Sequence, residues 1–91
     1  MKMQSPSLIR YLRANPNATE EQLMLREEAE HFARCLLMPK EIIEEFWDNF
    51  NTFPSLYKFY FFHKKLKIMA NIFNVPIDEM RYRLYELGLI D

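Results

Sequence analysis

Glycine and cysteine are almost absent from this chain of 91 residues, which contains one of each. Tight hairpin turns need residues that tolerate positive φ angles and usually take glycine, so its scarcity argues against a sheet protein. The single cysteine, Cys35, excludes a disulfide within one chain and indicates a reducing compartment. The sequence has no run of 18 apolar residues and no signal-peptide layout at its N-terminus. We therefore expect an all-α, cytoplasmic protein with no membrane partner.

An excess of charge of one sign is also lacking. The chain carries 12 Lys and Arg against 13 Asp and Glu, a net charge of −1. Residues 51–91 are mildly basic, but this falls far short of the charge typical of a nucleic-acid-binding surface. The apolar fraction of 49 % is ample for a core, and the length predicts one helical domain over residues 1–91.

Apolar residues at helical spacing predict a compact bundle of four to five helices. Ser5-Pro6 is typical of a helix start, and Thr19 to Gln22 is a capping box that begins a long second helix. Pro39 ends the second helix, and Gly88 is a natural stop for the last one. The expected helices cover about residues 5–15, 19–38, 39–50, 55–74 and 76–87.

The second expected helix carries apolar side chains along one face at spacings of three and four. Such a stripe normally faces the core of a globular domain. We therefore expect it to be buried. Its members are Leu25, Ala29, Phe32, Ala33, Leu36 and Leu37.

The fourth expected helix has two apolar seams, more than a bundle of this size usually needs. Exposed aromatic side chains mark partner surfaces. We expect a protein partner, or a second copy of the chain, to bind an aromatic cluster with an acidic rim. The residues of this predicted interface are Trp47, Tyr57, Tyr60, Phe61, Glu44 and Glu45.

Two segments together resemble the ImmA/IrrE-type family of zinc metallopeptidases. The first is "AEHFARCLLMP", residues 29–39, which is similar to the family helix Ala-Asn-x-Phe-Ala-x-x-Leu-Leu-Met-Pro. The second is "MANIFNVPIDEMRYRLYELG", residues 69–88, which is similar to the family's closing helical element. The two segments stand in the family's order. The span from the start of the first to the end of the second, residues 29–88, covers about two-thirds of the sequence. The resemblance implies the helical C-terminal part of such a peptidase.

The zinc site of that family has no counterpart here. The family needs His-Glu-x-x-His, in which two histidines one helical turn apart bind zinc and the glutamate acts as base. The sequence contains no such motif. The resemblance places Arg26 where the family has its third zinc ligand, and a cation at this position repels zinc. It places Glu30 where the family has an asparagine beside the zinc ligands. We expect an ion pair between Arg26 and Glu30, no metal, no cofactor and no enzymatic activity.

His31 and Cys35 stand one turn apart, and Glu27 stands one turn before His31. This spacing fits a metal site, but no fourth ligand is near in sequence, so we favour two unrelated side chains on a solvent-facing flank. Cys35 is also a candidate nucleophile. A catalytic thiol needs a base and an orienting group. Because the sequence identifies neither, we favour plain packing for Cys35.

The last two helices have the pattern of a helix-turn-helix, with a short turn at Val75-Pro76. The second of them would begin with Asp78 and Glu79, which oppose phosphate. DNA binding is therefore the alternative function, and nucleic acid is the less favoured partner. The candidate DNA contacts are Lys64, Lys65, Lys67, Arg81 and Tyr82.

These observations favour a non-catalytic protein-binding module over an enzyme. Members of the resembled family are commonly carried by phages and mobile elements, where they act on regulators. A relative without the catalytic helix is expected to keep the partner surface and lose the cleavage. The resemblance thus implies an inhibitor or antagonist of a host or phage regulatory or defence protein.

Overall fold

The computed structural model describes the backbone of residues 3–50 and 58–91, and the side chains of residues 3–49 and 62–91. Within these ranges the chain is helical and contains no strand, which confirms the all-α prediction. No helix in the described ranges is both long and apolar enough to cross a membrane. The helices are α1 (Pro6–Ala14), α2 (Glu20–Leu37), α3 (Lys40–Phe50), α4 (Lys58–Phe73) and α5 (Ile77–Glu86).

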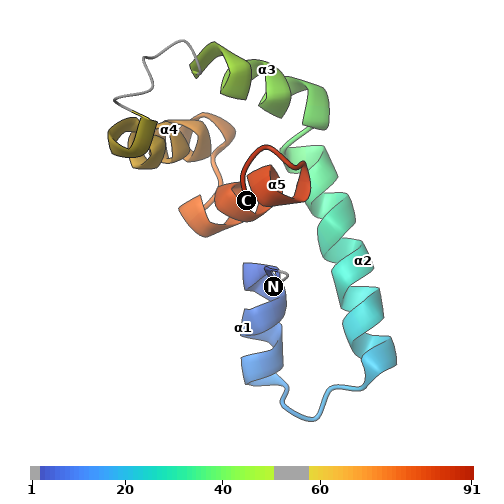
Figure 1. Ribbon diagram of the computed structural model, residues 1–91. Helices are drawn as coiled ribbons and strands as arrows, with labels where there is room; N and C mark the ends of the chain where they lie inside the picture. Colours follow the sequence, from blue (N-terminus) through green and yellow to red (C-terminus); the bar gives the residue numbers. More distant parts are fainter. Residues whose placement is uncertain (1–2, 51–57) are drawn as a thin grey trace.

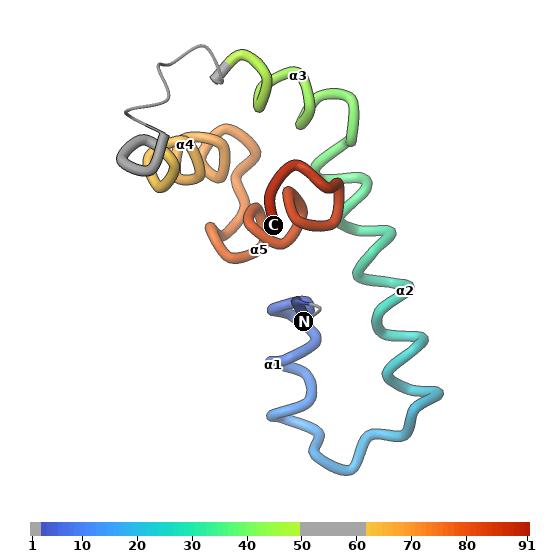
Figure 2. Tube along the Cα trace, viewed as in Figure 1, coloured from blue at the N-terminus to red at the C-terminus, as the bar shows by residue number. Residues whose placement is uncertain are grey.

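The helices form two groups (Figure 1). α1 and α2 are joined by a short turn and run in opposite directions, while α3, α4 and α5 gather at the C-terminal end of α2. α5 packs against both α4 and α1, so it connects the two groups. The N-terminal end of the described chain lies beside α5 (Figure 2), where the Met3 N–H donates to Tyr85 Oη at 3.3 Å.

The expected helix starts are present. Leu8 N–H donates to Ser5 Oγ at 3.4 Å at the beginning of α1. At α2, Gln22 N–H donates to Thr19 Oγ1 at 3.2 Å, and Thr19 N–H donates to Gln22 Oε1 at 2.9 Å. This is the predicted capping box, which satisfies donors that a helix start otherwise leaves unpaired.

The helix ends at α4 and α5 use left-handed residues. Gly88 has φ of 75°, and the Leu89 N–H reaches back to the Leu84 carbonyl at 2.9 Å. Asn74 takes the equivalent place after α4 with φ of 54°, and the Val75 N–H donates to the Ala70 carbonyl at 3.0 Å. Both are Schellman ends, and asparagine is the residue other than glycine that tolerates this conformation best.

The core lies between α3, α4 and α5. Phe46 and Phe73 pack edge to face on its border, with ring centroids 5.7 Å apart. One expected apolar seam of α4 faces this core through its described members, whereas Ile68 and Ile72 of the second seam are exposed. The core-facing members are Phe62, Leu66, Met69 and Phe73. Among the side chains that the structure describes, the buried apolar ones are Met38, Ile43, Trp47, Leu66, Met69, Ala70, Met80 and Leu84.

The expected burial of the α2 stripe is wrong. Phe32 and Leu36 are each 66 % exposed, and Leu25 is 61 % exposed. The residue that α2 buries is Arg34, which is 3 % exposed. The reason is that the polar side of α2 faces the other helices, so its apolar side turns to solvent.

Candidate functional site

The α2 apolar face contains four of the nine large apolar side chains that are exposed among the described residues. We define it as residues Leu25, Ala29, Phe32, Ala33, Leu36 and Leu37, all of which are exposed. Monomeric soluble proteins rarely expose contiguous apolar surface of this kind without a function. The face is formed by side chains at i, i+4, i+7, i+8, i+11 and i+12, which lie on one side of an α-helix.

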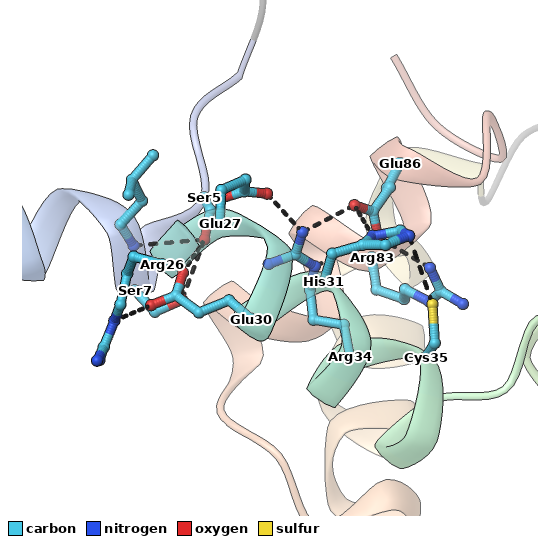
Figure 3. A network of polar contacts seen from close by, with 11 residues as sticks. Ser5, Ser7, Arg26, Glu27, Glu30, His31, Arg34, Cys35, Arg83 and Glu86 are labelled. Carbon is cyan, nitrogen blue, oxygen red and sulfur yellow. Dashed lines mark hydrogen bonds and ion pairs between the residues drawn. The ribbon is translucent and has the colours of Figure 1, made fainter. Parts of the chain in front are cut away.

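Glu86 of α5 is the centre of a polar network that holds the opposite side of α2 (Figure 3). Its carboxylate accepts from Arg34 Nη2 at 2.9 Å and from Arg83 Nη1 at 2.8 Å. Arg34 Nη2 also donates to Glu27 at 2.8 Å, along α2. Charged side chains buried this deeply are stable only when they are paired and hydrogen-bonded. The network therefore fixes which side of α2 faces α5.

Arg83 joins this network to the end of α2. Its side chain is 4 % exposed, and its Nε donates to the Met38 carbonyl at 3.0 Å. The last carbonyls of a helix have no partner within the helix. Arg83 supplies a hydrogen-bond donor for one of these carbonyls from α5, and the Met38 side chain lies in the core. α2 is thus bound at its C-terminal end by both packing and charge.

The electrostatics of this network favour the charged forms. Burial alone lowers the pKa of Arg34, but hydrogen bonds to Glu86 and Glu27 outweigh it and raise the pKa. Burial alone raises the pKa of Glu86, but the hydrogen bonds from Arg34 and Arg83 lower it below its usual range. Tyr82 lies under the Arg34 guanidinium, 4.7 Å from ring centroid to Cζ. Burial and the charge of Glu27 raise the pKa of Tyr82.

A second polar cluster attaches α1 to α2. Arg26 Nε donates to Glu30 Oε1 at 2.9 Å, which confirms the expected ion pair. Ser7 Oγ donates to the other oxygen of Glu30 at 2.9 Å, and the Arg26 guanidinium lies 5.0 Å from the centroid of the Tyr11 ring. The positions that the resemblance assigns to zinc ligation therefore hold the α1–α2 hairpin together.

Cys35, His31 and Glu86 form a chain of contacts at the edge of the network (Figure 3). His31 Nε2 lies 3.6 Å from Cys35 Sγ, and His31 Nδ1 lies 3.1 Å from Glu86 Oε2. Because ionised Glu86 only accepts, Nδ1 is the nitrogen that donates to it, and Nε2 faces the thiol. The structure thus places a histidine and a carboxylate in line with Cys35, an arrangement that the sequence did not identify.

Cys35 lies inside α2, where backbone N–H groups are bonded to the helix itself and are not available to stabilise an oxyanion. Among the described residues, no group of three or more His, Cys, Asp or Glu side chains is placed to hold a metal ion.

The predicted aromatic interface is only partly described. Trp47 is 7 % exposed and packs edge to face on Phe62, with Lys65 Nζ 3.8 Å from its ring centroid. Its expected exposure is wrong, because α3 and α4 enclose it in the core. Of the expected rim, Glu45 is exposed and Glu44 lies 3.9 Å from Lys40. The side chains of Tyr57, Tyr60 and Phe61 lie outside the described residues.

The predicted DNA contacts are spread over α4 and α5. Lys64 and Lys67 are exposed on α4, and Arg81 is exposed on α5. Lys65 lies over Trp47, and Tyr82 lies under Arg34, so both are engaged in the fold. The structure therefore does not gather these five side chains into one exposed basic surface.

The start of α5 is also turned towards α1. Arg10 donates to Asp78 at 3.1 Å and to Glu79 at 3.2 Å. In a helix-turn-helix, this end of the second helix enters the major groove. Here α1 lies against it, and two carboxylates occupy it.

Comparisons of the chain with protein families, curated proteins and solved structures found no match. The residues that organise the site are therefore defined by the structure alone. Sequence reasoning missed Arg34, Arg83 and Glu86. One signal was available, since Glu27 and Arg34 stand seven residues apart on the side of α2 opposite the apolar stripe.

Proposed function

We propose that this chain is a non-catalytic protein-binding module whose interface is the α2 apolar face. One observation carries the proposal: α2 buries its charged side and exposes its apolar side. Burying exposed apolar surface is the main favourable term in protein association. The most exposed members, Phe32 and Leu36, are of the size that anchors an interface.

The kind of partner follows from the shape of the face. It is a stripe of apolar side chains along a helix of 18 residues. Such a stripe is complementary to another amphipathic helix, whose apolar side chains pack between those of α2. The wider proposal, an inhibitor or antagonist of a regulatory or defence protein of a host or phage, rests on the family resemblance of the sequence.

Capture experiments with two matched variants test this proposal. The chain is immobilised, incubated with extract of its native host, and the captured proteins are identified by mass spectrometry. Phe32→Glu places a charge at the centre of the face and should weaken capture about tenfold or more, as loss of an interface anchor does. Ile72→Glu is the control, because Ile72 is exposed on α4.

Both substituted side chains are exposed, so helix content by circular dichroism should match the wild type. A partner that both variants capture equally well would contradict the α2 interface. A mobility-shift assay covers the DNA alternative. Steeply salt-dependent DNA binding that is lost when Lys64 and Lys67 are replaced by alanine would favour that alternative over protein binding.

A further inference from the structure

We infer that the α2 apolar face binds a second copy of this chain, and that the two α2 helices run parallel about a two-fold axis. This inference rests on the proposed function, because it names a partner for the same face. It follows from the spacing of the apolar residues, the side of α2 that the rest of the chain occupies, and the charges along both edges of the face.

The apolar residues of α2 have coiled-coil spacing. Leu25, Ala29, Phe32 and Leu36 follow one another at intervals of four, three and four. This is the d, a, d, a order of a heptad, which packs against the same seam of another helix. All four are exposed. The small residue Ala29 allows close approach of two helices, and Phe32 can fill the space beside it.

The rest of the chain leaves this seam open. In the same heptad Glu27 and Arg34 are f positions, which lie opposite the seam, and both belong to the network with α5. Figure 1 shows α2 at the margin of the molecule, with the other helices on one side of it. A second α2 can therefore pack along the outer side of the first. The other helices of each copy then lie on the side of α2 that faces away from the partner.

The two edges of the face carry opposite charges. One edge holds the g positions Glu21 and Glu28, and the other holds the e position Arg26, followed by Ala33. In a parallel pair each g position lies beside the e position five residues later in the partner. Glu21 of each copy then faces Arg26 of the other, twice by symmetry. Arg26 keeps further N–H groups for this contact, since its Nε is the atom bonded to Glu30.

An antiparallel pair is disfavoured by the same charges. In that arrangement g positions face g positions, which would bring Glu21 and Glu28 of one copy against those of the other. Like charges across a helix pair are destabilising. The pattern therefore selects a parallel orientation and is complementary to itself, as a two-fold interface requires.

The shape of the single chain agrees with this inference. Its radius of gyration is 14.8 Å, and its extents are 47 × 23 × 21 Å. A compact domain of this length has a radius of gyration of about 12 Å. The chain is longer because the α1–α2 hairpin extends away from the α3–α5 group (Figure 1). Pairing through α2 covers apolar side chains that the single chain leaves exposed.

The oligomeric state is the first test. Light scattering during size exclusion, over micromolar to submillimolar loading, should give a mass that rises to twice that of the chain. Phe32→Glu should remain at the mass of one chain, and Ile72→Glu should behave as the wild type. A wild type that stays monomeric throughout would overturn the dimer. If the chain is monomeric but captures a protein from extract, and Phe32→Glu no longer captures that protein, the proposed function stands.

Cross-linking tests the orientation. In a Cys35→Ser background, Ala29→Cys and Leu36→Cys each place one thiol on the seam. In a parallel pair each a position faces its own copy, so both variants should form covalent dimers on mild oxidation. In an antiparallel pair only a residue on the two-fold axis faces itself, so cross-linking of one variant alone would overturn the parallel arrangement. Ile72→Cys is the control and should not cross-link.

Discussion

At the residue scale, Glu86 is the carboxylate that connects α2 to α5. It pairs with Arg34, Arg83 and His31, and it does so across the boundary between α2 and α5. Arg34 and Arg83 both have side chains that are 4 % exposed. Two buried guanidinium groups therefore depend on one carboxylate, and removing it leaves charge in the interior without its main partner.

Glu86→Gln should lower the free energy of unfolding by about 3 kcal/mol at neutral pH, the size expected when one partner of a buried ion pair is removed. Urea denaturation measures this change. Glu45→Gln, at an exposed position on α3, is the control and should change stability by less than about 0.5 kcal/mol. Equal stability of Glu86→Gln and the wild type would contradict the role of the network.

The titration of Glu86 should make the stability of the fold fall at acid pH. The pKa of Glu86 is lower in the fold than its ordinary value of 4.5, because the hydrogen bonds from both arginines outweigh burial. Its contribution is therefore complete above that ordinary value and is lost as the pH falls through the lowered one. Denaturation between pH 6 and pH 2 should show a steeper loss of stability in the wild type than in Glu86→Gln.

At the element scale, α2 is stabilised at both ends by contacts that differ in kind. The start of α2 is stabilised by a local contact, because the side chains of Thr19 and Gln22 bond each other's backbone N–H. The end of α2 is stabilised by a tertiary contact, because Arg83 of α5 donates to the Met38 carbonyl. Most helical stability in proteins comes from tertiary packing, so the contact with α5 and the local cap both help to keep α2 helical over its whole length.

Thr19→Ala should destabilise the chain by about 1 kcal/mol, because it removes one side of the capping box. Thr19→Ser keeps the hydroxyl oxygen and is expected to stay close to the wild type. Thermal unfolding followed by circular dichroism distinguishes the two. If alanine and serine behave alike at this position, the capping bond contributes nothing to stability.

At the scale of the whole molecule, the described core lies at one end of α2, and α2 exposes an apolar face along its length. Among the described side chains, the eight buried apolar residues come from α3, α4, α5 and the residue that follows α2. Arg10 of α1 adds polar contacts to α5. A fold of this kind gains stability when another chain covers the apolar face, because such binding favours the folded state alone.

The midpoint of thermal unfolding should therefore depend on protein concentration. A hundredfold increase should raise it by about 5 °C or more in the wild type, since association adds to the free energy of unfolding by mass action. Phe32→Glu should unfold at the same temperature at every concentration. Differential scanning fluorimetry over a dilution series measures both.

The sequence by itself determined the elements of this protein. Ser5, the capping box at Thr19 and the stop at Gly88 act within a few residues of themselves, so their signals are local and the structure contains all three. The ion pair of Arg26 with Glu30 was predictable for the same reason, because it spans one helical turn.

Only the tertiary structure decided which side of each helix is covered. The stripe on α2 has the pattern of a buried face, yet burial also depends on what another helix presents. Here α5 presents Glu86 and Arg83, so it pairs with the charged side of α2 and leaves Phe32 and Leu36 outside. The periodicity of α2 defines its two sides, whereas contacts with residues of α5, 45 and 52 positions away in the sequence, decided which side the fold buries.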